Sequence, residues 1–107
     1  AFAMWKQGQA DEAINAVEKA LSIEPECVRG LIQLARLYQQ TDRHANAAER
    51  LEQALSLGVE YADVYFLLGQ SYRVTGQVKQ AREAFNQAIR INGRYADARE
   101  ALAAIAV

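Results

Sequence analysis

The sequence repeats itself with a period of 34 residues. Alanine recurs in two rows seven residues apart, and larger apolar residues recur in step with them: Ala13, Ala47 and Ala81; Ala20, Ala54 and Ala88; Val17, Leu51 and Phe85; Leu21, Leu55 and Ile89. These matches are spread over the whole period, so chance and biased composition explain them poorly. A repeat of this length predicts a stack of similar units, each of which buries its apolar face against its neighbours.

Each period contains two helical patterns separated by a short polar break. Leu31, Leu34, Ala35 and Tyr38 have the spacing of one helix face, and Gln-Thr-Asp-Arg then interrupts the pattern. Breaks this short make neighbouring helices antiparallel. We expect left-handed C-terminal caps at the glycines near helix ends, namely Gly8, Gly58, Gly76 and Gly93. The predicted helices lie near residues 1–7, 10–23, 28–40, 44–57, 62–74, 78–91 and 96–107.

Small residues recur where the two helices of a pair should touch. Ala35 and Gly69 share one repeat position in the first helix, and Ala47 and Ala81 share another in the second. Such residues let helix axes approach to about 8 Å while larger side chains fill the flanking space. The recurring aromatic residues Tyr38, Tyr72 and Phe85 are therefore predicted to be core.

The period of 34 and the motifs Tyr65-x2-Leu68-Gly69-x2-Tyr72 and Ala81-x3-Phe85-x2-Ala88 resemble the tetratricopeptide repeat (TPR). The resemblance covers the whole chain as a single TPR-like segment: 1–27 a partial repeat, 28–61 and 62–95 complete repeats, 96–107 a trailing helix. It implies an all-α, right-handed solenoid of antiparallel helix pairs. It also implies that the first helices line a concave groove that holds a peptide or protein segment. Tyr65 replaces the usual tryptophan, and Val59 and Gly93 replace the terminal proline.

Catalytic and metal-binding patterns are missing from the sequence. His44 has no second histidine or cysteine at ligand spacing, so a solvated turn residue is the favoured interpretation. Cys27 has no obvious base nearby and is interpreted as a small buried hydrophobic residue. We therefore expect no enzyme activity, no cofactor and no metal within these residues.

Charge and hydropathy narrow the class of partner. Twelve basic residues stand against 13 acidic ones, which argues against nucleic acid as a partner. No apolar run approaches the roughly 20 residues of a membrane-spanning helix, so we expect a soluble protein without membrane insertion. The compartment stays open, because the start resembles an excerpt from a longer chain and any signal peptide would lie upstream. Of the two compartments considered, the cytoplasm is favoured over the periplasm.

The candidate binding residues are those on the first helices that the core does not use. Ile32 and Phe66 are large and apolar at positions that packing should not require, and arginines stand beside them. Guanidinium groups suit carboxylates or peptide carbonyls, so the expected ligand is a peptide segment with acidic residues beside an apolar anchor. The predicted groove residues are Trp5, Arg29, Ile32, Arg36, Gln39, Asp63, Phe66, Gln70 and Arg73.

The family subset that grips a chaperone's C-terminal carboxylate uses a lysine and an asparagine where this chain has Ile32 and Arg36. That clamp is absent. The favoured function is a protein-interaction scaffold that binds a peptide or protein segment. Two alternatives stay open: self-association through exposed apolar ends, with Phe2, Met4 and Trp5 at one end and Leu102 and Ile105 at the other, or the regulatory or targeting arm of an enzyme whose catalytic domain lies outside the segment.

Overall fold

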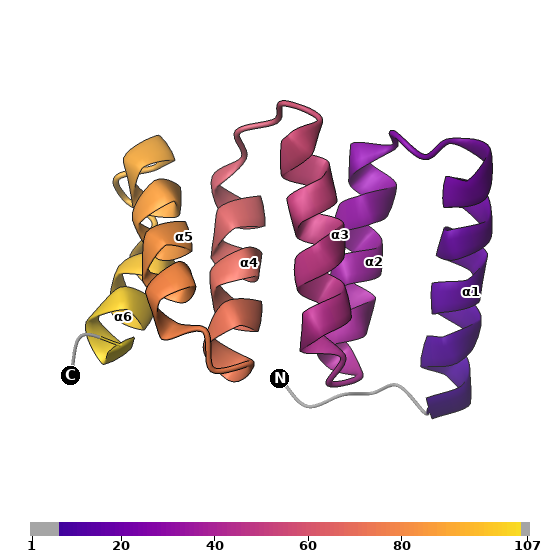
Figure 1. Ribbon diagram of the computed structural model, residues 1–107, viewed down its shortest axis with the longest axis horizontal. Coiled ribbons are helices and arrows are strands. Elements are labelled where there is room, and N and C mark those ends of the chain that lie inside the picture. Colours follow the sequence, from indigo (N-terminus) through magenta and orange to yellow (C-terminus); the bar gives the residue numbers. More distant parts are fainter. Residues whose placement is uncertain (1–6, 106–107) are drawn as a thin grey trace.

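The computed structural model describes residues 7–105, which form a row of antiparallel helices (Figure 1). Within these residues the helices are α1 (Gln7–Ile23), α2 (Val28–Gln40), α3 (His44–Ser56), α4 (Ala62–Val74), α5 (Val78–Ile91) and α6 (Ala96–Ile105). α2 packs on α3 and α4 on α5, while α1 and α6 form the two ends of the row. The fold is therefore an all-α solenoid of helix pairs, in which α2, α4 and α6 are first helices and α1, α3 and α5 are second helices.

The repeat period places all of these helices to within a few residues. A further helix is predicted for residues 1–7. Residues 1–6 lie outside the described residues, and Gln7 is the first residue of α1. The break predicted at Gly8 is wrong, because α1 begins at Gln7 and passes through this glycine. The backbone N–H groups of a first helical turn need no intrahelical acceptor, so a glycine at this place weakens the helix little.

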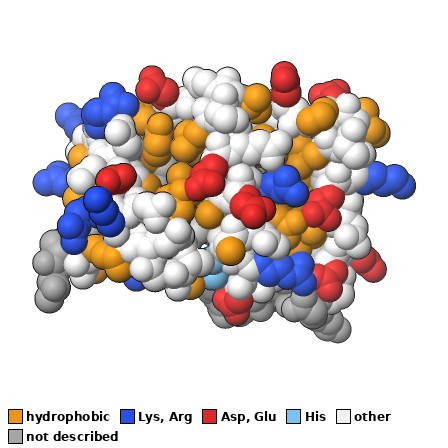
Figure 2. Space-filling model, viewed as in Figure 1, with side chains coloured by type: hydrophobic (Ala, Val, Ile, Leu, Met, Phe, Trp, Pro, Cys, Tyr) orange, Lys and Arg blue, Asp and Glu red, His pale blue; other side chains and the backbone are white. Residues whose placement is uncertain are grey.

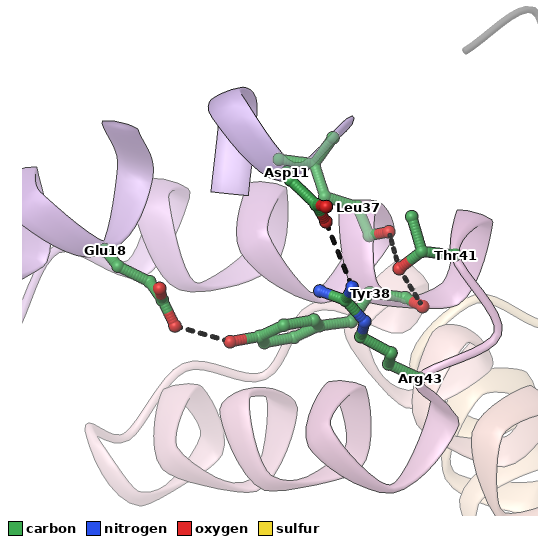
Figure 3. Close-up of polar contacts among 6 residues, drawn as sticks. All are labelled: Asp11, Glu18, Leu37, Tyr38, Thr41 and Arg43. Carbon is green, nitrogen blue, oxygen red and sulfur yellow. Dashed lines mark hydrogen bonds and ion pairs between the residues drawn. The ribbon is translucent and has the colours of Figure 1, made fainter. Parts of the chain in front are cut away.

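The turn between first and second helix is built the same way in both pairs. The Thr41 hydroxyl donates to the carbonyls of Leu37 and Tyr38 at 3.0 and 3.1 Å (Figure 3), and Thr75 repeats both bonds one period later. The next residue is left-handed, with φ of 61° at Asp42 and 83° at Gly76. These bonds satisfy carbonyls at the end of the first helix.

The left-handed caps predicted at Gly76 and Gly58 are confirmed, since both have positive φ. The cap predicted at Gly93 is wrong: α5 ends at Ile91, and the extended backbone of Asn92 follows it. An extended residue also ends a helix, so no left-handed glycine is needed there.

Close approach of α4 and α5 depends on the glycine of the core motif. A Cβ on Gly69 would lie 2.6 Å from the Phe85 ring, closer than side chains pack. Phe85 itself is fully buried, as is Leu51 at the same repeat position of α3. Gly69 therefore makes room for the largest fully buried side chain, as the small-residue row predicts.

Tyrosines of the first helices bond to the preceding unit. The Tyr38 hydroxyl donates to Glu18 on α1 at 2.5 Å (Figure 3), and Tyr72 donates to Glu52 on α3 one period later. Burial, followed by the hydrogen bond to the carboxylate, raises the pKa of both tyrosines above the ordinary value of 10.0. These bonds fix each pair against its predecessor.

Candidate functional site

The predicted binding residues on α2 and α4 form two parallel stripes. Arg29, Ile32, Arg36 and Gln39 follow one another at spacings of three and four residues along α2, and the residues of α4 repeat this spacing. We call the surface that these stripes form the first-helix face; its residues are Arg29, Ile32, Arg36, Gln39, Asp63, Phe66, Gln70 and Arg73.

Gln39 joins the two stripes. Its side-chain Nε2 donates to the Leu67 carbonyl and to the Ser71 hydroxyl, both at 2.8 Å. Ser71 is fully buried. The amide of Gln39 is therefore occupied in holding α2 against α4, and it contributes to the face mainly by positioning its neighbours.

Arg36 and Asp63 form an exposed ion pair across the same junction. Arg36 Nη2 lies 4.0 Å from Asp63 Oδ2, and their side chains are 58% and 50% exposed. Exposed pairs of this length contribute about 1 kcal/mol or less to stability. The guanidinium therefore remains available to a second carboxylate.

Phe66 is less available than its sequence position suggests. Its ring centroid lies 5.1 Å from that of Tyr95 and 5.8 Å from that of Phe85. Phe66 and Ile32 both pack against the core cluster and are half-buried. The expectation that packing does not require them is wrong, because both side chains pack against the core cluster.

Tyr95, just before α6, adds a polar group that the sequence did not single out. Burial raises the pKa of its hydroxyl, the carboxylates of Asp63 and Asp97 raise it further, and Arg36 opposes them. The phenol therefore lies within the electrostatic influence of charges from α2, α4 and α6. Its counterpart one period earlier, Tyr61, is 51% exposed, so the repeat pattern carried no signal for this contact.

The remaining predicted residues lie at the margins of the first-helix face. Arg29 and Arg73 are exposed, and within residues 7–105 neither forms an ion pair. Gln70 is half-buried. Trp5 lies outside the described residues. The structure thus brings together Arg36, Gln39, Asp63 and Phe66, with a free guanidinium to either side.

His44 and Cys27 were considered above as a metal ligand and a nucleophile, and the structure shows where each of them lies. His44 begins α3, and its side chain is only 17% exposed, with Nε2 3.6 Å from Asp42 Oδ1. The interpretation as a solvated turn residue is therefore wrong, because the start of α3 carries the ring into a largely buried position. Cys27 is half-buried. Among the described residues, no group of three or more His, Cys, Asp or Glu side chains is placed to hold a metal ion.

No helix within residues 7–105 combines the length and apolar character needed to cross a membrane. The first-helix face carries the guanidinium groups of Arg29, Arg36 and Arg73, and its Phe66 ring lies beside that of Tyr95.

Solved structures share this fold over nearly the whole chain. MamA is 30% identical, with a TM-score of 0.89 over 92% of this chain and 58% of its own. The Sgt2 TPR domain from Aspergillus fumigatus is 26% identical, with a TM-score of 0.82 over 92% of this chain and 67% of its own. The first TPR of Spaghetti (RPAP3), bound to the HSP90 peptide SRMEEVD, is 21% identical, with a TM-score of 0.88 over 94% and 79%. The chain thus spans little more than half of MamA.

Sequence comparisons agree with the fold. The search of curated proteins returned no match. A family model described as a tetratricopeptide repeat matches residues 32–92, more than half of the chain, and a second with the same description matches residues 4–49. The chain therefore belongs to the tetratricopeptide repeat family.

Proposed function

We propose that this chain is a protein-interaction scaffold whose first-helix face binds a peptide or protein segment of a partner. The observation that carries the proposal is the half-exposed Arg36–Asp63 pair beside the aromatic surface of Phe66 and Tyr95. Charge and aromatic surface combined on one accessible face are typical of binding surfaces. The proposed role is binding, without catalysis by these residues.

The charges of this face favour an acidic ligand. Arg29 and Arg73 flank the pair formed by Arg36, and a guanidinium donates two parallel hydrogen bonds to a carboxylate. Asp63 competes with such a ligand for Arg36 and repels it. A segment that places a carboxylate at Arg36 and an apolar side chain over Phe66 fits this arrangement.

The solved relatives support the chemistry of this ligand. The two RPAP3 domains are bound to the peptides SRMEEVD and SGPTIEEVD, which combine glutamate and aspartate with apolar residues. Those domains are 21% and 17% identical to this chain, so the likeness is one of fold alone. Ile32 and Arg36 replace the lysine and asparagine of the carboxylate clamp, so we propose the same ligand chemistry with different contacts.

Charge substitutions at one ion pair test the proposal. A peptide is first selected from a random library on the wild-type chain, and its affinity for each variant is then measured by titration. Arg36→Glu should weaken binding, most strongly at low salt, where screening is weakest. Asp63→Asn should strengthen binding, because it frees Arg36 and removes a repelling carboxylate.

Arg82→Glu is the matched control for Arg36→Glu, because Arg82 is an exposed arginine of the second helix α5 and its substitution changes the net charge by the same amount. Phe66→Ala should cost the complex about 1–3 kcal/mol with little salt dependence. Its thermal unfolding must be measured alongside, since Phe66 also packs on Phe85. Equal affinity of the wild type, Arg36→Glu, Asp63→Asn and Arg82→Glu would place binding on another surface.

A further inference from the structure

A hollow of about 290 Å³ lies between α4 and α5, and none of the residues that line it belongs to the first-helix face. Its lining includes Tyr65 and Tyr72 of α4 and Ala84 and Gln87 of α5. All of its lining residues come from one complete helix pair in the interior of the row. The hollow is therefore a feature of the repeat, and the helix pair α2–α3 offers the same positions for comparison.

In the earlier helix pair an arginine occupies these positions. Arg50 of α3 stands at the repeat position of Ala84, and it lines a hollow of about 360 Å³ together with Glu18 and Gln53. Arg50 Nη1 donates to Gln53 Oε1 at 3.1 Å. Glu18 accepts the hydrogen bond of the Tyr38 hydroxyl. A guanidinium, a carboxylate, an amide and a phenol thus form one cluster around this position.

The charge of Arg50 acts on the tyrosine of this cluster. Burial and the carboxylate of Glu18 raise the pKa of Tyr38, and Arg50 opposes them. At Tyr72, burial and the carboxylate of Glu52 raise the pKa in the same way, and no cation of the described residues opposes them. The later helix pair therefore repeats the phenol and the carboxylate without the guanidinium.

The surface of the molecule shows the same difference (Figure 2). Over α1 and α3, at the right of the view, Lys or Arg side chains lie next to Asp or Glu side chains. Over α3 and α4, near the centre of the view, Asp or Glu side chains lie beside hydrophobic ones. The charges between the second helices are thus mixed on one side of α3 and acidic on the other.

The groups that surround Arg50 are present again at the hollow. Glu52 accepts the hydrogen bond of the Tyr72 hydroxyl, and Gln87 stands at the repeat position of Gln53. Gln87 Oε1 accepts one hydrogen bond, from Arg90 Nε at 2.8 Å. A carbonyl oxygen has two lone pairs, so this oxygen can accept a second donor from the hollow.

Two further features suit a guanidinium. Glu83 lines the hollow, and within residues 7–105 neither Glu83 nor Glu52 forms an ion pair. Tyr65 lines it at the position that Leu31 holds in the earlier hollow, which adds an aromatic ring. Guanidinium groups stack on such rings and donate paired hydrogen bonds to carboxylates, so the combination favours arginine over lysine.

We propose that this hollow binds an arginine side chain of a partner protein, which takes the place that Arg50 holds in the earlier helix pair. The guanidinium donates to Gln87 and to the carboxylates of Glu52 and Glu83, with its flat side against the ring of Tyr65. The site shares no residue with the first-helix face. It is therefore a second contact point for a partner, independent of the proposed peptide binding.

Titration with a small arginine probe, followed by NMR, tests the site directly. The probe is N-acetyl-arginine amide, and its control is N-acetyl-citrulline amide, which has nearly the same shape without the charge. At millimolar concentrations the arginine probe should shift the signals of Tyr65, Tyr72, Ala84 and Gln87 in a saturable manner. The citrulline compound should leave these signals unchanged.

Two variants should remove this response. Ala84→Arg introduces the side chain that Arg50 provides in the earlier pair, so it should fill the hollow and abolish the shifts. Glu52→Gln keeps an acceptor for the Tyr72 hydroxyl but removes the charge, and it should weaken the probe's affinity several-fold. Because Glu52 is exposed, this second variant does not burden the fold. Glu12→Gln, at an exposed glutamate of α1, makes the same charge change and should have no effect.

The reciprocal variant should create a second site. Arg50→Ala vacates the equivalent position, so the arginine probe should then also shift the signals of Tyr38 and Gln53. Absence of these new shifts would overturn the proposal. So would a wild-type chain whose signals stay unchanged, an equal response to the citrulline compound, or equal affinity of Glu52→Gln and Glu12→Gln for the arginine probe.

Discussion

α1 and α5 carry the same repeat pattern in different surroundings. In α5 the two alanines and the larger apolar residue of this pattern, Ala81, Ala88 and Phe85, are fully buried under α4. In α1 the residues at the same positions, Ala13, Ala20 and Val17, are half-buried or exposed. The contrast shows that in a solenoid the neighbouring helix, and not the sequence of the helix alone, determines what a core position contributes. Stability should therefore be distributed unevenly along the chain.

The largest expected effect comes from shortening the core residue at this shared position. Phe85→Ala should lower the free energy of unfolding by about 3–5 kcal/mol, because it leaves a cavity between α4 and α5. Val17→Ala removes two methyl groups from a half-buried site and should cost about 1 kcal/mol or less. Urea unfolding of both variants measures the difference. A loss of about 2 kcal/mol or more in Val17→Ala, the amount expected when two methyl groups leave a fully buried site, would mean that α1 is covered as completely as α5.

A smaller effect should follow from enlarging the residue that faces this position. Gly69→Leu places a side chain where the Phe85 ring lies 2.6 Å from a Cβ, and should cost at least about 1–3 kcal/mol through overpacking. Ala103→Leu makes a similar change at the same repeat position of α6, where the residue is exposed. In dilute solution the second variant should keep the wild-type unfolding midpoint. A comparable loss in both would contradict the assigned packing faces.

The bonds between units should give the smallest effect. Tyr72→Phe removes the hydrogen bond to Glu52 and should cost about 0.5–1.5 kcal/mol. Tyr65→Phe is the control, since Tyr65 makes no side-chain hydrogen bond within residues 7–105. Unchanged stability in Tyr72→Phe, or an equal loss in Tyr65→Phe, would contradict the role of this bond.

The same tyrosine predicts a pH dependence. The folded state raises the pKa of Tyr72 above 10.0, so the unfolded chain loses this proton first as pH rises. Stability should then fall above about pH 10 and remain unaffected by this group below it. The fall should be shallower in Tyr72→Phe than in the wild type, measured by urea unfolding at several pH values. Parallel profiles for the two proteins would contradict the shift.

The sequence predicted the helices because apolar rows such as Val17, Leu51 and Phe85 recur in every unit. It failed where a residue type is compatible with more than one backbone state. Gly8 and Gly76 share a repeat position, yet the first continues a helix and the second ends one. The interpretation of His44 was wrong for a related reason. A histidine that follows a polar break can point into solvent or into the protein, and the sequence does not indicate which.

The candidate site was predictable only in part. Helical spacing placed Arg36 and Asp63 on the faces of two successive first helices, and their ion pair followed from that placement. The contact between Phe66 and Tyr95 was not predictable, because it depends on how the segment before α6 returns to α4. Tyr61 and Tyr95 share a repeat position, yet Tyr61 is 51% exposed whereas the ring of Tyr95 lies against that of Phe66.

Hydrogen exchange of backbone amides, followed residue by residue in dilute solution, tests most directly the claim that neighbouring helices set local stability. We expect the amides of α4 and α5 to exchange most slowly, through global unfolding, and those of α1 to exchange much faster, through local opening. Protection of α1 equal to that of α5 in dilute solution would contradict the account.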